Sequence, residues 1–274
     1  MPFLQRDQTN LYYEKTGQGP ALILLHALPF DHSLYLYQIE HFSAWFTLIA
    51  IDFRGFGRSS SPDETYGLDD LRDDVLAICK SENIDQAIVL GTSIGSKVAT
   101  LIGLDRPDFC KAVIAVGGGN RPSDHYQSHI MGYQAGRETF HAQHLKSVLS
   151  SNYANSPLGQ HFIQTMLERA AHLNMQGAGM ARTVQAAHDR DLRPRLPDLS
   201  PPLLVLNGEF DNSLPRGKET ATLVTGSTHH ILEGCGHACC IEDPQTFNAH
   251  VFHFLHQHGL FPSGRDHTDN RPRD

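Results

Sequence analysis

Short runs of apolar and β-branched residues alternate along most of the chain with segments whose apolar positions recur at helical spacing. This alternation is typical of a mostly parallel β-sheet covered by helices on both faces, so we expect an α/β protein. Helical spacing marks residues 71–79 and 98–104, and Pro244 opens a helix to about His256 as a first-turn proline. The apolar runs that predict strands are residues 11–14, 21–25, 46–51, 87–90, 112–116, 203–206 and 229–232.

The alternation stops at Asn120 and resumes only after Pro201 and Pro202. The segment between them is polar, rich in histidine and helical in pattern, and it contains no candidate strand. We interpret it as a helical cap inserted between two strands of one sheet, because so short a segment makes a marginal core for an independent second domain. The predicted units are a core domain of residues 1–119 and 193–260, a helical cap of residues 120–192 and a disordered tail of residues 261–274.

Composition narrows the range of partners. The chain has 22 Lys and Arg against 30 Asp and Glu, a net charge of −8, and its pI is about 6.1. No basic surface is then expected for phosphates or anionic lipids, so we expect neither a nucleic acid nor a membrane partner. The first ten residues lack a signal-peptide pattern, and five cysteines are an odd number in a chain large enough to fold without disulfides. We therefore expect a cytoplasmic protein without structural disulfides.

A G-x-S-x-G motif occupies residues 91–95, directly after the strand 87–90 and before the helix 98–104. A strand-to-helix turn this sharp crowds the backbone at the serine, so glycine is required two residues to either side. The turn raises the hydroxyl of Ser93 above the sheet edge, and the helix that follows directs N–H groups towards it. We therefore predict that Ser93 is a nucleophile, in preference to a purely structural Gly-Ser turn.

A serine nucleophile needs a base and a group that orients this base. The chain has 18 histidines, so only position can select among them. His237 lies in a glycine-containing loop after the strand 229–232. Asp211 follows the strand 203–206, so both side chains are expected at the carboxyl edge of the sheet, where open α/β sheets bind ligands. Glu209 lies nearer the strand end and is the alternative acid.

The order of serine, acid and histidine resembles the α/β-hydrolase family, whose members share the nucleophile elbow and this same order. The resemblance covers residues 11 to about 260 and implies the α/β-hydrolase fold. The cap and its polar connection 187–192 resemble the enol-lactonase and small carboxylesterase branch. Other matching segments are the oxyanion-loop-like residues 24–29 (LLHALP), the turn of residues 52–59 (DFRGFGRS) and the Glu-x-Pro-like residues 242–244 (EDP).

The resemblance also implies roles for particular backbone groups. The N–H groups of Leu28 and Ile94 are expected to form the oxyanion hole. Ala27 departs from the family's usual glycine at that loop, and an alanine limits the backbone freedom there. The residues predicted to line the substrate pocket are His26, Met131 and Phe140.

Hydrolysis of a carboxylic ester or lactone, through an acyl-serine intermediate and without a cofactor, is the function that these residues favour. A small ester, a small lactone and a macrocyclic lactone all remain open, as does the oligomeric state. Neither a metal nor a nucleotide is expected, because the chain has no phosphate-binding glycine motif and no paired zinc-site spacing at Cys235, His237, Cys239 and Cys240. The expected partner is therefore a small-molecule substrate.

Two alternatives use the same fold. A ligand-sensing receptor with slow hydrolysis needs an apolar exposed cap, whereas residues 123–143 are polar. The other alternative is a cofactor-independent oxygenase or a carbon–carbon bond hydrolase. In oxygenases of this fold the acid often follows the strand before the cap, where residues 117–120 read GGGN, without a carboxylate. Both observations favour the hydrolase, and neither alternative is removed by the sequence.

Overall fold

The computed structural model of the chain describes residues 3–122, 125–135, 138–173 and 177–262. Within them an eight-stranded sheet has the strand order β1-β2-β4-β3-β5-β6-β7-β8. Strand β2 pairs antiparallel with β1 and with β4, whereas every other neighbouring pair is parallel. The sheet confirms the predicted mostly parallel α/β class. Its strands are β1 (Phe3–Arg6), β2 (Thr9–Thr16), β3 (Ala21–Leu25), β4 (Thr47–Ile51), β5 (Ala87–Thr92), β6 (Cys110–Val116), β7 (Leu203–Gly208) and β8 (Thr228–Leu232).

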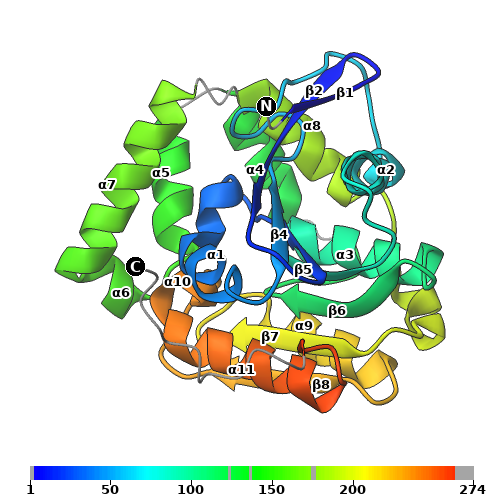
Figure 1. Cartoon of the computed structure of the whole chain (residues 1–274). Helices are drawn as coiled ribbons and strands as arrows, with labels where there is room; N and C mark the ends of the chain where they lie inside the picture. Colours follow the sequence, from blue (N-terminus) through cyan, green and yellow to red (C-terminus); the bar gives the residue numbers. More distant parts are fainter. Residues whose placement is uncertain (1–2, 123–124, 136–137, 174–176, 263–274) are drawn as a thin grey trace, which may run out of the picture.

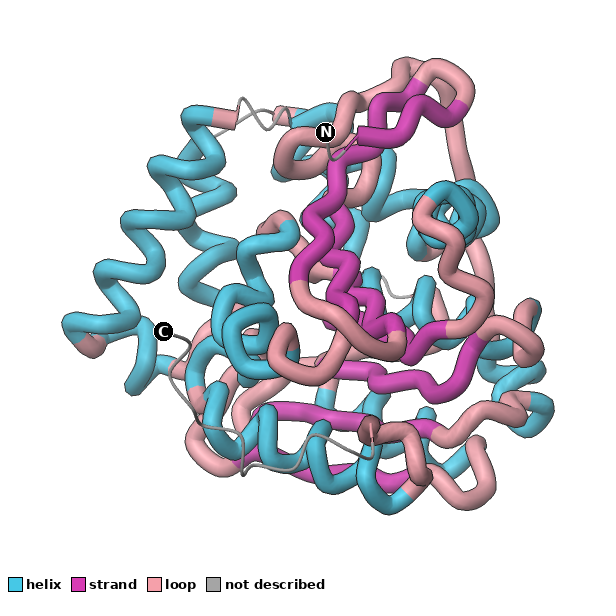
Figure 2. The backbone as a smooth tube through the Cα atoms, in the orientation of Figure 1, coloured by secondary structure: helices cyan, strands magenta, loops and turns pink. Residues whose placement is uncertain are grey.

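Helices cover both faces of this sheet (Figure 1). The strand direction turns from nearly vertical at β2 to nearly horizontal at β7 and β8, which is the twist expected of a parallel sheet (Figure 2). The helices are α1 (Leu36–Phe42), α2 (Leu68–Ser81), α3 (Ile94–Asp105), α4 (His125–Gln134), α5 (Glu138–Ser147), α6 (Ser151–Asn155), α7 (Pro157–His172), α8 (Gly177–Ala187), α9 (Leu214–Leu223), α10 (Cys239–Glu242) and α11 (Pro244–Gln257), with 3-10 turns η1 (His32–Tyr35) and η2 (Arg193–Asp198).

The central strands are apolar throughout because both of their faces are covered. All five residues of β3 are buried. Ile23 and Leu25 belong to the hydrophobic cluster that includes α2 and α3, whereas Leu22 and Leu24 belong to the cluster that includes α1 and α11. The period of two along a strand thus divides one apolar run between two cores.

The turn between β2 and β3 differs from the simplest expectation for two strands joined by a tight connection. The strands are consecutive in sequence, but β4 lies between them in the sheet. Gly17 and Gly19 have φ angles of 81° and 135°, and a side chain at either position would collide with the backbone at Trp45 or Phe46. The glycines therefore allow the turn to pass closely over the start of β4.

The described part of the chain between β6 and β7 forms helices α4 to α8 and the turn η2. Helix α4 packs on α8, and α8 also contacts α3 of the sheet layer. Helices α5, α6 and α7 stand together at one side of the molecule (Figure 1). The described portion of this inserted segment contains no strand, which agrees with its polar helical pattern.

Residues 261–274 are the tail that is expected to be disordered. The first of them, Phe261, packs against three aromatic rings of the core domain. The ring of Phe261 lies 5.4 Å from the ring of Trp45, 5.5 Å from that of Phe46 and 4.5 Å from that of Phe252. Its apolar ring is partly buried against side chains of α11 and of the loop after α1, and burial of apolar surface is favourable. Residues 263–274 lie outside the described residues.

The five cysteines are buried as free thiols. Burial raises the pKa of Cys79 and of Cys110 to about 12, so both side chains behave as small apolar groups at neutral pH. Among the described residues, no helix combines the length and the apolar character needed to cross a membrane.

A buried ion pair fixes the loop after β4. Arg54 Nε and Nη2 donate to the two carboxylate oxygens of Asp74 at 2.7 and 2.6 Å, and Arg6 Nη1 donates to the same carboxylate at 2.8 Å. Asp74 and Arg54 are only 1% and 5% exposed. Such a pair contributes little net stability when intact, but removal of one partner leaves an uncompensated buried charge.

We predict that Asp74→Ala lowers the free energy of unfolding by about 3–5 kcal/mol, because the Arg54 guanidinium loses its carboxylate while it stays buried. The neighbouring Asp73→Ala should lower it by less than about 1 kcal/mol, because that side chain is 41% exposed. Urea denaturation of both variants measures the difference. Equal effects of the two substitutions would contradict the assignment of the buried pair.

Candidate active site

Ser93 occupies a strained turn between β5 and α3. Its φ and ψ are 56° and −113°, a conformation that non-glycine residues seldom adopt. The turn is anchored on both sides: the Ser93 N–H donates to Val116 O at 2.8 Å, and its carbonyl accepts from the Ser96 N–H at 3.1 Å. The observed backbone is therefore the nucleophile-elbow geometry that the G-x-S-x-G motif predicts.

The two flanking glycines are required by close packing. A side chain at Gly91 would collide with the carbonyl of Gly95, and one at Gly95 would collide with the carbonyl of Leu25. Helix α3 thus starts in backbone contact with the end of β3. Because β3 continues into the loop of Leu28, this contact holds Ser93 and that loop together.

Asp211 and His237 lie at the ends of neighbouring strands and contact one another. His237 Nδ1 is 2.9 Å from Asp211 Oδ1. An ionised carboxylate only accepts hydrogen bonds, so Nδ1 donates to it and Nε2 is the ring nitrogen left to act as a base. The Asp211 carboxylate also accepts from the Ser213 N–H at 2.7 Å, the Ser213 hydroxyl at 2.8 Å and Asn207 Nδ2 at 2.9 Å.

These partners keep the buried acid ionised. Burial by itself raises the pKa of Asp211, which is 4% exposed, but the charge and hydrogen bond of His237 and the donors of Ser213 and Asn207 outweigh it. The pKa of Asp211 therefore lies well below its ordinary value of 3.8. The alternative acid, Glu209, is exposed and accepts from the Gly234 N–H at 2.9 Å, so it braces the loop before His237.

Gly117, at the end of β6, makes room for this pair. Its φ is 55°, and a Cβ there would lie 2.9 Å from His237 Nδ1 and 3.2 Å from Asp211 Oδ2. The segment after β6 carries no carboxylate. The space beside Gly117 is filled by Asp211, which follows β7, and by His237, which follows β8. A bulky residue at Gly117 is incompatible with that arrangement.

A cavity of about 440 Å³ opens beside Ser93, a volume within the usual range for small-molecule sites. Ser93, Asp211 and His237 share it with side chains from the cap, from the loop of Leu28 and from α9. Its lining residues are Leu28, Ser93, Tyr126, Ser128, His129, His144, Ser147, Val148, Phe210, Asp211, Asn212, Ser213, Arg216 and His237.

The three residues expected to line the pocket, His26, Met131 and Phe140, are not among those lining it. Met131 is 61% exposed and faces solvent from α4. The ring of Phe140 packs against Tyr133, with ring centroids 5.1 Å apart, and is partly buried against the hydrophobic cluster that includes Tyr133. Helical spacing shows which residues share a face, but it does not show which face turns to the cavity, and this is where the expectation fails.

His26 is a buried structural residue beneath the loop of Leu28. It is fully buried between Phe53 and Phe56, its Nε2 accepts from the Phe53 N–H at 3.0 Å, and Nδ1 lies 3.0 Å from Ala27 O. Burial lowers the pKa of His26, which favours the neutral ring that this bonding needs. Ala27 lies outside the left-handed region, so the alanine there fits its backbone without strain.

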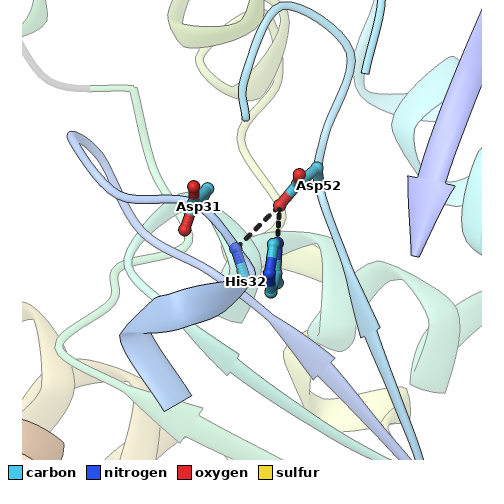
Figure 3. Close-up of side chains that lie close together, drawn as sticks. All are labelled: Asp31, His32 and Asp52. Carbon is cyan, nitrogen blue, oxygen red and sulfur yellow. Dashed lines mark hydrogen bonds and ion pairs between the residues drawn. The ribbon is translucent and has the colours of Figure 1, made fainter. Parts of the chain in front are cut away.

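Asp31, His32 and Asp52 gather at the far end of the same loop (Figure 3). His32 Nδ1 and its backbone N–H both lie 2.7 Å from Asp52 Oδ1. Every carboxylate oxygen already accepts an N–H, because the second Asp52 oxygen accepts from Arg58 N and Asp31 accepts from Ser33 N and Arg169 Nε. We read the group as a hydrogen-bonded anchor that joins the loop to β4 and to cap helix α7.

A family model for the alpha/beta hydrolase fold matches residues 20–244, most of the chain. The protein belongs to the α/β-hydrolase family. It is 29% identical to 3-oxoadipate enol-lactonase 2 of Acinetobacter baylyi, covering 87% of this chain and 90% of that protein. It is 25% identical to a pimeloyl-[acyl-carrier protein] methyl ester esterase of Vibrio vulnificus, covering 87% of this chain and 95% of that protein.

Solved structures agree on the fold of this α/β hydrolase. The enol-lactonase from Burkholderia xenovorans LB400 superimposes with a TM-score of 0.85 over 93% of this chain and all of that one, at 23% identity. At that identity the likeness speaks for the fold alone. Together with the family match and the curated relatives, this structure confirms the resemblance to enol-lactonase and esterase members of the family.

Several residues that line the cavity of this α/β hydrolase belong to none of the sequence motifs. Tyr126, at the start of α4, lines the cavity together with Ser93. His144, on α5, lies with Nδ1 2.6 Å from the Tyr133 hydroxyl, and burial lowers the pKa of His144 well below its ordinary value. Arg216 extends into the cavity from α9. None of them stands in a recognisable spacing, so only the folded arrangement reveals them.

The lowered pKa of Asp211 predicts a pH-dependent contribution to stability. The contribution is complete above the ordinary carboxyl pKa of 3.8, and it is lost as the pH falls from there towards the lower pKa of the folded protein. The difference in unfolding free energy between wild type and Asp211→Asn should therefore be largest near neutral pH and shrink below about pH 4. Urea titrations over this range measure it, with the exposed Asp63→Asn as control. A difference that does not change with pH would contradict the prediction.

Proposed function

We propose that the protein hydrolyses a carboxylic ester or lactone through an acyl-serine intermediate. The observation that carries the proposal is the convergence on one cavity of Ser93, at a strained elbow, and the hydrogen-bonded pair Asp211 and His237. A nucleophile, a base with a free Nε2 and a buried acid that orients this base are the requirements of serine catalysis.

In the first half-reaction, Ser93 Oγ attacks the carbonyl carbon while its proton passes to His237 Nε2. The negative charge that develops on the carbonyl oxygen is stabilised by the N–H groups of Leu28 and Ile94. Asp211 holds the imidazole in the tautomer that accepts this proton and stabilises the resulting cation. The tetrahedral species then breaks its bond to the alcohol oxygen, which takes the proton from His237 and leaves an acyl-serine.

In the second half-reaction, water attacks the acyl carbon and gives its proton to His237. The bond to Ser93 breaks, the serine recovers its proton, and the carboxylic acid is released. In a lactone the alcohol and the acid belong to one molecule, so the first leaving group stays attached to the acyl chain until water releases both. Each step moves only protons and acyl bonds, so no cofactor is required.

The named relatives support this reaction class over the receptor and oxygenase alternatives. One is named for an enol-lactone and another for a methyl ester, and both bonds are broken by attack on an acyl carbon. The absence of a carboxylate at residues 117–120 also favours the ester or lactone reaction over oxygenation.

We predict that an alkyl fluorophosphonate attaches once to the wild type and not at all to Ser93→Ala. The variant should lower kcat for a p-nitrophenyl ester by roughly a thousandfold or more, because the covalent route is lost. Intact-protein mass spectrometry counts the attached label. Labelling that persists in Ser93→Ala would remove the nucleophile assignment, and an unchanged thermal unfolding transition serves as the control for folding.

We also predict that Asp211→Asn reduces kcat/KM by roughly a thousandfold or more, because the amide no longer fixes the reactive tautomer of His237. The matched change Glu209→Gln should reduce it by less than about tenfold, because that side chain only braces a loop. Steady-state kinetics on one p-nitrophenyl ester compares the two. The reverse ranking would transfer the role of the acid to Glu209.

A further inference from the structure

Cap helix α5 turns one face to the cavity. His144, Ser147 and Val148 all line it, and residues three and four positions apart share a helix face. The Val148 N–H donates to His144 O at 3.2 Å, so the helical turn continues to that residue. The Val148 carbonyl accepts from the Ala238 N–H at 2.9 Å, and Ala238 directly follows His237. This face of the cap is therefore held beside the predicted base.

The imidazole of His144 is anchored inside the cap at one of its two nitrogens. The side chain is 8% exposed, and its Nδ1 lies 2.6 Å from the hydroxyl of Tyr133 on α4. Tyr133 is only 4% exposed, so a hydroxyl that merely accepted would keep its own proton buried without an acceptor. We therefore assign the hydroxyl as the donor and Nδ1 as the acceptor. A neutral ring that accepts at Nδ1 carries its proton on Nε2.

This ring is neutral at neutral pH. Burial has the largest effect on its pKa, and the neighbouring His129, His237 and His141 act in the same direction, so the pKa lies well below the ordinary value. The ring of His129 stacks on that of His144, with centroids 4.3 Å apart and planes at 15°. Stacking and the bond to Tyr133 together fix the plane of the ring. Nε2 is thus an oriented, uncharged donor in a side chain that lines the cavity.

We infer that Nε2 of His144 donates a hydrogen bond to the substrate, which is then an ester or lactone with a second, uncharged oxygen acceptor such as an ether or a carbonyl. This inference rests on the proposed function, whose substrate class it narrows. The acceptor is uncharged because His144, Ser147 and Val148 bring no charge to this face to compensate a buried anion. Tyr133 is a positioning residue, since it acts on the substrate only through the tautomer of His144.

The first experiment compares substrates that differ by one oxygen atom. The p-nitrophenyl esters of methoxyacetate and butyrate have acyl chains of equal length, as do those of 3-methoxypropanoate and pentanoate. Each pair exchanges an ether oxygen for a methylene, and the intrinsic effect of that oxygen on reactivity cancels when variants are compared. We expect His144→Phe to lower the ether-to-alkyl ratio of kcat/KM in at least one pair by roughly 3- to 10-fold.

Three further variants separate donation from packing. His144→Gln should recover part of the lost ratio, because its amide nitrogen lies the same number of bonds from Cα as Nε2. Tyr133→Phe should lower the ratio, since Nδ1 loses the donor that keeps the proton on Nε2. The matched control is His141→Phe, which makes the same exchange on the same helix at a residue that is not among those lining the cavity. It should leave the ratio unchanged.

The second experiment reads the ring itself and needs no turnover. Proton–nitrogen correlation spectra of protein labelled with 15N-histidine report which ring nitrogen is protonated, and the signals of His144 are those lost in His144→Phe. We expect a neutral ring with its proton on Nε2 at neutral pH. Its Nε2 signal should shift more with methoxyacetone than with pentan-2-one, or more with 4-methoxybutan-2-one than with hexan-2-one. These ketones match the two acyl pairs and are not hydrolysed.

A proton on Nδ1, or equal shifts within both ketone pairs, would overturn the inference. So would an His144→Phe variant that slows ether and alkyl esters alike, because the residue would then support packing or the triad. A ratio that falls as far in His141→Phe as in His144→Phe would overturn it too, by making the effect a general one of α5.

The two proposals fail separately. If the protein cleaves no ester and takes no fluorophosphonate, but the ether ketones still shift the Nε2 signal selectively, the proposed hydrolysis is wrong and the hydrogen-bond subsite stands. If it cleaves esters and takes the label, but the ratios do not change in His144→Phe, the subsite is wrong and the hydrolysis stands.

Discussion

The backbone contact between the start of α3 and the end of β3 is the constraint on which the rest of the site depends. Gly95 lies against the carbonyl of Leu25, and Gly91 lies against Gly95, so the chain turns from β5 into α3 without room for a side chain. The turn forces Ser93 to a φ of 56°, a conformation that costs about 1–3 kcal/mol. The cost is offset by hydrogen bonds to β6 and within α3, and by the complete burial of most of that helix between strands and cap.

Parallel strands then bring distant parts of the sequence to one edge. Every part of the site follows the carboxyl end of one of five neighbouring strands. These parts are the loop after β3, the elbow after β5, the glycines after β6, Asp211 after β7 and His237 after β8. Their mutual fit is steric as well as electrostatic, because Gly117 leaves the space that His237 and Asp211 fill. The same sheet edge gives Arg216 its position over Gly119.

The cap is tied to this edge by hydrogen bonds that two acids accept, the buried Asp31 and the half-buried Glu242. Asp31, in the loop after β3, accepts from Arg169 of α7, so the cap and the oxyanion-like loop share one anchor. Glu242 accepts from the Ser150 N–H at 3.1 Å and from the Gly236 N–H at 2.9 Å, which connects the cap to the loop of His237. Hydrogen bonds thus hold the cap to the two loops that flank Ser93.

Local patterns in the chain were enough to predict the α/β class, the elbow at Ser93 and the strand-end positions of Asp211 and His237, because period-two apolar runs and glycine-bounded turns act over a few residues. Other features depended on contacts between segments far apart in sequence. They are the pairing of β2 with β4, the outward face of Met131 and the burial of His26 beneath the loop of Leu28. Arg216 and Gly119 are separated by 97 positions of chain and carry no shared motif. Only the tertiary structure decides that they lie together, because α9 packs on β7 and contacts the segment that follows β6.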